Sequence, residues 1–455
     1  TYRWNILKKS PSLAMVVRRP ATKRSTPAAS AASLCGLPKS KPEAEALASA
    51  PLEQLKEVVA AEVKCGALAG AAHVVLRHGK CVMAFGDGKA SKDGNFTLRT
   101  LCKLHGCTKP LVACAFLTLV DRGKVKLSDP VSKYIPFSEV KATKAKKSVA
   151  VKTIPTLRNL LTMTAGLQYQ DCPAYRDTMK QIRKGKIKRL VDMCEALAEH
   201  PLQNEPGSCY TYSFCTDFLG RVCEKVSGKS LESFMKTALL EPLGMRDTHF
   251  VVPANKRSRQ ATLYDCQRIA GNYVCKVWQH PERADGIMSG GGGILSYHDP
   301  GMWSTVEDYV KFCQMLLTGR SPSGKEILRP KTLKSLWQDS LVEYGRKDGR
   351  LPGWHDAAGR SPGGVWDFTG WSLLNTHLTF QEPPKAGFTR MGQTMWMGGG
   401  GGTYWVVDRT HQTVAVSFSQ SFGGRGHSTD TAKDASIFTE AAVEEGRPTK
   451  RRRMK

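Results

Sequence analysis

Three short segments hold the residues that could do chemistry, in the order HGCTKP (105–110), CYTYSF (209–214) and WMGGGGGTYWVVD (396–408). The first contains Lys109 at the start of a largely apolar stretch, and the second contains Tyr212. A lysine amine and a tyrosine hydroxyl can pass protons, and the backbone N–H groups of a glycine-rich strand can stabilise an oxyanion. These residue types could therefore take part in proton transfer beside a developing negative charge.

The order of these segments resembles the serine β-lactamase and D-alanyl-D-alanine peptidase superfamily, and most closely its esterase and transesterase branch. The resemblance covers roughly residues 51–420, including the blocks TLCKLHGCTKPLVACAFLTLVDRGKVKLSDPVSKYIP and YSFCTDFLGRVCEKVSGKSLESFMKTALLEPLGM. It implies a Ser-x-x-Lys motif at the start of a central helix, where a spacing of three residues lets the lysine take the serine proton. It also implies site residues: a catalytic lysine, Lys109; a proton-relaying tyrosine, Tyr212; and a substrate-binding third motif at Gly398, Gly399 and Gly400.

The nucleophile position departs from this motif, because the residue three before Lys109 is Gly106. Glycine carries no nucleophile, so the sequence predicts a catalytically impaired protein that keeps the pocket. Two alternatives stay open: Cys107 or Thr108 acts as the nucleophile, or the working protein has serine at position 106. Cys107 lies about 100° further around the helix axis, so its thiol should point away from the cleft. The other Ser-x-x-Lys, beginning at Ser233, falls in a segment that resembles a structural helix.

Two further departures favour ester chemistry over antibiotic hydrolysis. Phe214 stands where β-lactamases have the asparagine of Tyr-x-Asn, and Asp217 follows it as in the esterase branch. The third motif, from Met397, lacks the Lys-Thr-Gly that binds a β-lactam carboxylate. The expected ligand is therefore a small ester or amide, and the main alternative to an impaired protein is an active carboxylesterase or transesterase.

The patterns around these motifs predict the elements that position them. Residues 69–90 read as two strands around a His78-Gly79 turn, and residues 397–420 as two strands joined by a turn at Asp408 to Gln412. Helices are expected before and between these strands, each inferred from apolar spacing and from its terminal residues; they lie near 52–63 and at 108–122, 156–167, 215–228 and 305–319. The SGGGG run from Ser289 predicts close backbone packing. The fold class is therefore α/β: a β-lactamase/transpeptidase-like fold with an antiparallel sheet from both chain ends, flanked by helices and with a helical region inserted.

The chain has 455 residues, 41% of them hydrophobic, and a formal net charge of +27. The stretches 1–42, 141–190 and 447–455 hold 26 of the 27 excess positive charges. Such segments can bind an acidic partner, which leaves a non-enzymatic scaffold as a third hypothesis. Dedicated nucleic-acid binding is disfavoured because no zinc-finger, helix-turn-helix or RNA-binding pattern accompanies the charge. No apolar run is long enough for a transmembrane helix.

The fourteen cysteines include no Cys-x-x-Cys pair, and no partner spacing supports a metal at His105 or His298. No cofactor or metal is expected, and reduced, buried thiols favour an intracellular location. The basic, acid-free N-terminal segment is typical of an organellar transit peptide of a mitochondrion or plastid, or of a disordered tail. The expected organisation is a tail at 1–50, a β-lactamase-related domain at 51–440 and a basic tail at 441–455.

Overall fold

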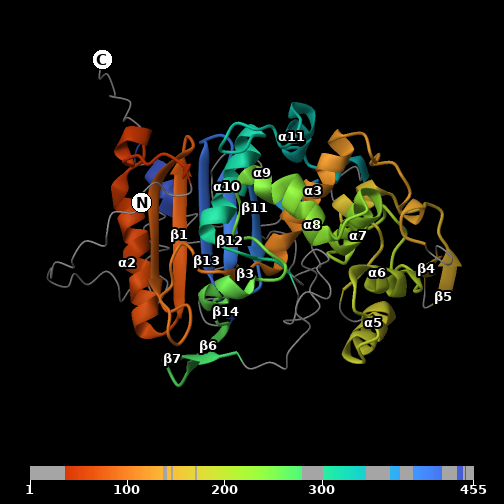
Figure 1. The fold of residues 1–455 in the computed structure, drawn as a ribbon, viewed down its shortest axis with the longest axis horizontal. Helices are drawn as coiled ribbons and strands as arrows, with labels where there is room; N and C mark the ends of the chain where they lie inside the picture. Colours follow the sequence, from red (N-terminus) through yellow and green to blue (C-terminus); the bar gives the residue numbers. More distant parts are fainter. Residues whose placement is uncertain are drawn as a thin grey trace, which may run out of the picture.

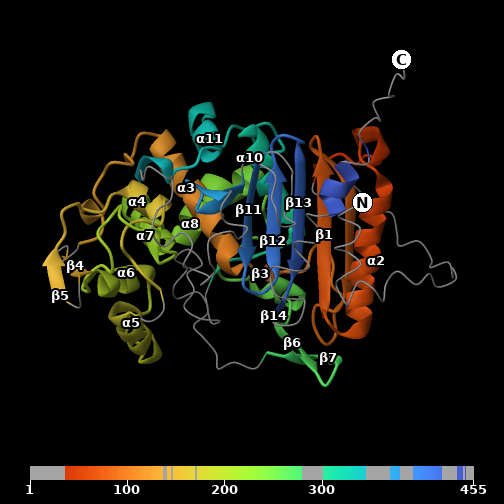
Figure 2. The same ribbon diagram turned by 180° about the vertical axis from the view of Figure 1, so that it is seen from behind.

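The computed structural model describes residues 36–136, 141–144, 147–169, 172–278, 301–344, 369–379, 393–422, 438–443 and 446. Its centre is a seven-stranded antiparallel sheet in the order β2-β1-β13-β12-β11-β10-β9 (Figures 1 and 2). Two strands come from the N-terminal part of the chain, β1 (Gly70–Arg77) and β2 (Lys80–Gly88). Five come from the C-terminal part: β9 (Thr369–Ser372), β10 (Thr376–Thr379), β11 (Thr394–Gly399), β12 (Thr403–Asp408) and β13 (Thr413–Ser419). The prediction that both chain ends build one antiparallel sheet is confirmed.

Both predicted hairpin turns lie where their residue types indicate. His78 and Gly79 have φ angles of 50° and 77°, which suit a two-residue turn between the paired residues Arg77 and Lys80. At the other turn, Asp408 accepts a hydrogen bond from the backbone N–H of His411 at 2.9 Å. The β12–β13 hairpin is therefore closed by its own aspartate.

Helices cover both faces of the sheet. Alternate residues of β1 enter two different apolar clusters, as expected for a strand buried on both faces. Val75 packs in a cluster with Leu55 and Val59 of α2 (Ser49–Cys65). Val74 belongs to the main core on the opposite face, which contains α3 (Thr108–Asp121) and α10 (Val306–Thr318). In Figure 1, α10 lies in front of the sheet, and α3 runs toward the helical region.

The helical region lies to one side of the sheet, at the opposite end of the molecule from α2 (Figure 1). Helix α7 packs against α3 and so connects this region to the centre of the fold. Its helices are α4 (Leu157–Leu161), α5 (Pro173–Arg183), α6 (Leu190–Ala198), α7 (Cys215–Ser227), α8 (Leu231–Met235) and α9 (Glu241–Leu243), and α11 (Pro330–Leu336) follows α10. Three small sheets pair β3 (Cys102–Lys103) with β8 (Trp303–Ser304), β4 (Lys141–Lys144) with β5 (Lys147–Ala150), and β6 (Tyr264–Ile269) with β7 (Asn272–Val277) and β14 (Ser421–Phe422).

The helix ends mostly follow the sequence signals. Thr305 caps α10 by accepting a hydrogen bond from the Asp308 N–H, and Gly319 ends it in the left-handed conformation. The segment 156–167 forms a shorter helix than expected. Helix α4 stops at Leu161, and Met163 adopts a positive φ of 56°.

The packed chain begins earlier than residue 51, because Leu37 and Leu47 are buried in the two apolar clusters. The structure also pairs Cys266 with Cys275 in a disulfide across β6 and β7, which departs from the expectation of reduced thiols. Eleven other cysteines of the described chain form no disulfide. The SGGGG run, His298, residues 1–35 and the C-terminal residues 447–455 lie outside the described residues.

The described part of the chain contains no helix long and apolar enough to cross a membrane.

Candidate functional site

Lys109 lies at the start of the central helix and is completely buried. A short 3₁₀ turn, His105–Cys107, precedes α3 and carries position 106. The Lys109 Nζ atom lies 4.6 Å from the centre of the Tyr212 ring and 5.5 Å from that of the Tyr169 ring. These distances are within the range of cation–π contacts. The structure thus brings together the lysine and the tyrosine that the sequence identified.

Gly106 lies beside Tyr212, the tyrosine that the Lys109 amine contacts. A Cβ atom built on Gly106 would lie 3.3 Å from the Tyr212 hydroxyl and 3.3 Å from the Met397 side chain. It would also lie 2.6 Å from the carbonyl oxygen of Gly398 on β11, closer than real Cβ atoms approach another atom. The nucleophile position therefore points at the tyrosine and the third motif, but the β11 backbone occupies the space of a side chain.

The glycines of the third motif let the β11–β12 hairpin pack closely against the turn before α3. Gly398 pairs with Tyr404 and Gly399 with Thr403, and Gly400 begins the turn between the strands. A Cβ on Gly399 would lie 2.2 Å from the Leu104 carbonyl oxygen, so only glycine fits there. The Thr403 hydroxyl donates a 3.0 Å hydrogen bond to that carbonyl. These contacts fix β11 at its distance from Gly106.

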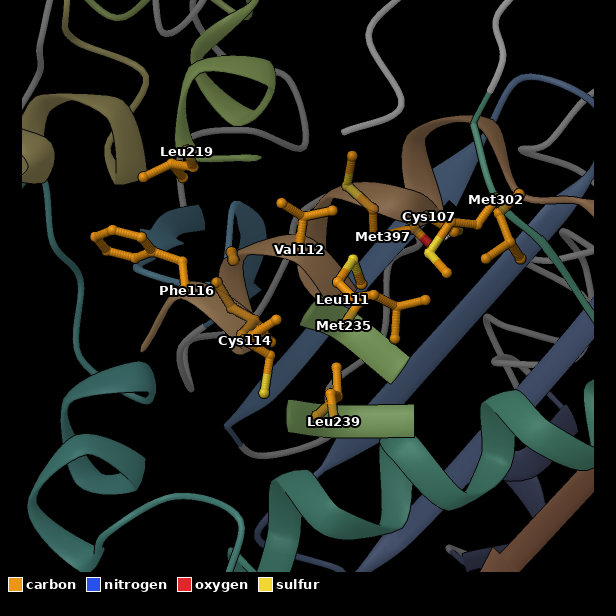
Figure 3. Close-up of a cluster of buried hydrophobic side chains, with 14 of the residues drawn as sticks. Cys107, Leu111, Val112, Cys114, Phe116, Leu219, Met235, Leu239, Met302 and Met397 are labelled. Carbon is orange, nitrogen blue, oxygen red and sulfur yellow. Dashed lines mark hydrogen bonds between the residues drawn. The ribbon is translucent and has the colours of Figure 1, made fainter. Parts of the chain in front are cut away.

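The side chains of Cys107 and Thr108 have partners away from the Lys109–Tyr212 pair. The Cys107 thiol lies 3.7 Å from the carbonyl oxygens of both Met397 and Thr403. Burial raises the pKa of this thiol to about 12, which disfavours the reactive thiolate. The Thr108 hydroxyl accepts a hydrogen bond from the Met302 N–H at 3.0 Å. Figure 3 shows Cys107 within the buried cluster beside Met302 and Met397.

The second Ser-x-x-Lys sequence lies on the surface. Ser233 is exposed on α8, and Lys236 is 65% exposed and forms a 3.7 Å ion pair with Glu241. Both residues are exposed, whereas Lys109 is buried, which fits a structural rather than a catalytic role for this pair.

Aromatic side chains enclose Tyr212. The Tyr212 ring centre is 5.8 Å from that of Tyr169 and 6.5 Å from that of Trp371, both in edge arrangements. Phe214, at the position of the β-lactamase asparagine, is buried, and its ring centre lies 4.6 Å from that of Tyr169. Asp217 is buried in the first turn of α7. The surroundings of Tyr212 are therefore more apolar than a Tyr-x-Asn motif would make them.

Sequence reasoning missed Tyr169 and Trp371. Tyr169 lies two residues after the segment 156–167, for which the sequence predicts only a helix. Trp371 lies in a region of weak pattern, and its indole N–H donates to the Leu161 carbonyl at 3.0 Å. Within the described chain, no group of three or more His, Cys, Asp or Glu side chains could hold a metal ion.

Two known proteins are similar in sequence to most of this chain. Esterase EstB of Burkholderia gladioli is 30% identical over 363 residues, which cover 75% of this chain and 83% of EstB. Protein Rv1367c of Mycobacterium tuberculosis is 27% identical over 84% of this chain and 91% of that protein. These alignments span most of both partners.

Solved structures show the same fold. EstCE1, a hydrolase with promiscuous acyltransferase activity, superimposes with a TM-score of 0.66 at 22% identity, covering 87% of this chain and 99% of EstCE1. Simvastatin synthase (LovD) from Aspergillus terreus gives a TM-score of 0.66 at 20% identity, covering 86% and 98%. The profile of the β-lactamase family matches residues 55–437. With a Lys109–Tyr212 pair beside a glycine-rich hairpin, and with this match along most of its length, the chain belongs to the β-lactamase family.

Proposed function

We propose that this chain is a catalytically impaired member of its family, which keeps a pocket for a small ester or amide but does not form an acyl-enzyme. One observation carries the proposal: position 106 has no side chain, and the Gly398 carbonyl oxygen lies 2.6 Å from where a Cβ would be. The similarity to an esterase and to an acyltransferase supports acyl transfer as the chemistry of the site.

Acyl transfer requires an oxygen or sulfur nucleophile to attack the substrate carbonyl carbon and hold the acyl group when the leaving group departs. Lys109 and Tyr212 can move protons, but neither takes the place of a hydroxyl at position 106. Cys107 would need its thiolate, which burial disfavours. The groups that remain can bind and orient an ester carbonyl without becoming acylated.

The test uses the purified full chain, a fluorophosphonate probe and p-nitrophenyl acetate, with EstB as the positive control. We expect no covalent mass shift and no turnover above that of buffer. Lys109→Ala should then give the same result as the unmodified chain. The matched control Lys236→Ala, at an exposed lysine that directly follows α8, should also give that result. Turnover that Lys109→Ala abolishes and Lys236→Ala preserves would disprove the proposal.

A second candidate, an active carboxylesterase for small acyl esters, is favoured by the 30% identity with EstB. It requires a nucleophile other than position 106. Mass spectrometry of the probe-treated chain distinguishes the two candidates, because the active enzyme would carry the probe on one identifiable residue.

A further inference from the structure

The exposed side of helix α5 is cationic. Arg176, Lys180 and Lys184 follow each other at intervals of four residues, which places them on one helical face, and all three are exposed. The opposite side of α5 is apolar, with Ala174 and Met179 buried in the core. The helix therefore presents only its charged side to the outside.

The chain beyond α5 continues this charge. Lys186 and Lys188 are also exposed, and no acidic residue occurs between residues 178 and 191. We call Lys180, Lys184, Lys186 and Lys188 the α5 cationic surface. None of these four lysines forms an ion pair with another described residue.

The two neighbouring acids, Asp177 and Asp192, form their short contacts with residues outside this set of four lysines. Asp177 lies 3.5 Å from His200 and accepts a 2.9 Å hydrogen bond from Gln181. Asp192 pairs with Arg189 at 2.6 Å. Asp177 also interacts electrostatically with Lys180 and offsets part of the charge, but the α5 cationic surface keeps a positive excess, which attracts external anions.

The same surface lacks what a protein or nucleic-acid interface usually contains. Its apolar residues point inward, since Met179 and Ile187 are buried, so there is no apolar centre for a protein partner. Tyr175 is only half exposed and packs against Phe214, so no free aromatic face is available to stack on a base. A flat layer of negative headgroups needs neither feature, because each lysine contributes independently.

We propose that the α5 cationic surface docks the protein onto an anionic lipid bilayer. Helix α5 lies at the end of the molecule opposite to α2, and the β4–β5 hairpin, with Lys141, Lys144 and Lys147 in its sequence, lies at that same end (Figures 1 and 2). The proposal concerns a surface apart from Gly106 and Lys109, so it stands whether or not the chain is catalytic.

The test measures co-sedimentation of the full chain with lipid vesicles at low and at high salt. One set of vesicles contains phosphatidylcholine alone, and the other also contains about 30 mol% phosphatidylserine. The variant changes the four lysines of the surface to glutamine. The matched control makes the same charge change at four exposed lysines elsewhere, Lys64, Lys229, Lys331 and Lys334. Urea unfolding of each protein checks that the substitutions leave the fold intact.

We expect salt-sensitive binding to the anionic vesicles only. A basic residue near such a surface contributes about 1 kcal/mol, so each lysine removed should weaken binding about fivefold. The affinity of the surface variant for the anionic vesicles should therefore fall more than about a hundredfold, and that of the control variant far less. Equal losses in both variants, or none in the surface variant, would overturn the proposal. So would a larger loss of binding to single-stranded polyadenylate than to vesicles, which would assign the surface to nucleic acid.

Discussion

Adding a single methyl group at Gly106 should destabilise the protein. In Gly106→Ala the new Cβ lies 2.6 Å from the Gly398 carbonyl oxygen, whereas ordinary contact begins at 3.4 Å. The turn before α3 and strand β11 must then separate by up to about 0.8 Å, the difference between these two distances. Backbone pairing of Gly398 with Tyr404 and the Thr403–Leu104 hydrogen bond both oppose this movement.

The magnitude follows from two opposing effects. Forcing extra volume into a packed interior costs about 1–3 kcal/mol. Replacing glycine by alanine restricts the unfolded chain, which returns about 0.4–1 kcal/mol. We therefore expect the free energy of unfolding of Gly106→Ala to fall by about 1–2 kcal/mol.

Urea unfolding followed by circular dichroism measures this change as a lower midpoint at constant slope. Gly94→Ala is the matched control, because its new Cβ meets only the flexible Ser91 hydroxyl at 3.1 Å and its φ is not positive. This control should change stability by less than about 0.5 kcal/mol. Gly399→Ala should lower the free energy of unfolding more than Gly106→Ala, because its new Cβ would lie 2.2 Å from the Leu104 carbonyl oxygen. A Gly106→Ala protein as stable as the Gly94→Ala control would refute the tight approach of β11.

Three further changes test how the rest of the fold is held together. Burial lowers the pKa of His73 to about 3, and neither ring nitrogen has a hydrogen-bond partner among the described residues. The unfolded histidine binds a proton near pH 6.5, so the contribution of neutral His73 to the free energy of unfolding falls between pH 6.5 and 3 by about 1.4 kcal/mol per pH unit. The urea midpoints at pH 7 and pH 5 should therefore differ less in His73→Leu than in the unmodified chain. An equal difference in both proteins would contradict this. Thr156→Ala removes the capping box with Asn159 and should cost about 1 kcal/mol of unfolding free energy, whereas an unchanged urea midpoint would show that the box contributes nothing. Burial opposes ionisation of Asp247, but two hydrogen bonds from Arg259, at 2.7 and 2.8 Å, keep the pKa of Asp247 below its usual value. Asp247→Asn should therefore lower the thermal midpoint at neutral pH, and the difference from the unmodified chain should shrink as the pH falls through the folded-state pKa; a constant difference would argue against the ion pair.

Local signals predicted the elements whose ends are set by nearby residues. The His78-Gly79 turn and the Asp408 turn could be predicted because residues within each turn supply the backbone conformation or the hydrogen bond. The same holds for the N-terminus of α10 at Thr305. The positions of Gly106, Lys109 and Tyr212 were accessible through motif order.

Contacts between segments far apart in the sequence could not be predicted from such local signals. Trp371 reaches Tyr212 because β9 adds to the edge of the sheet, and nothing in its own neighbourhood encodes that pairing. The burial of Leu37 depends on the bridge between Lys39 and Cys81, which are far apart in the sequence. The disulfide depends on the register of β6 and β7.

The close approach of β11 also determines what restoring the nucleophile can achieve. A serine at position 106 needs room for its Cβ and hydroxyl, yet the Gly398 carbonyl oxygen and the Met397 side chain occupy that room. Moving β11 outward, together with its partner strand β12, would stretch the 3.0 Å hydrogen bond from the Thr403 hydroxyl to the Leu104 carbonyl. The Gly106→Ser hydroxyl could recover about 1 kcal/mol through a hydrogen bond to Tyr212, not enough to offset the upper range of the packing cost. We therefore expect Gly106→Ser to react with a fluorophosphonate more slowly than EstB and to be less stable than the unmodified chain. Labelling at the EstB rate with undiminished stability would show that β11 yields freely, and that the missing hydroxyl alone separates this chain from a serine esterase.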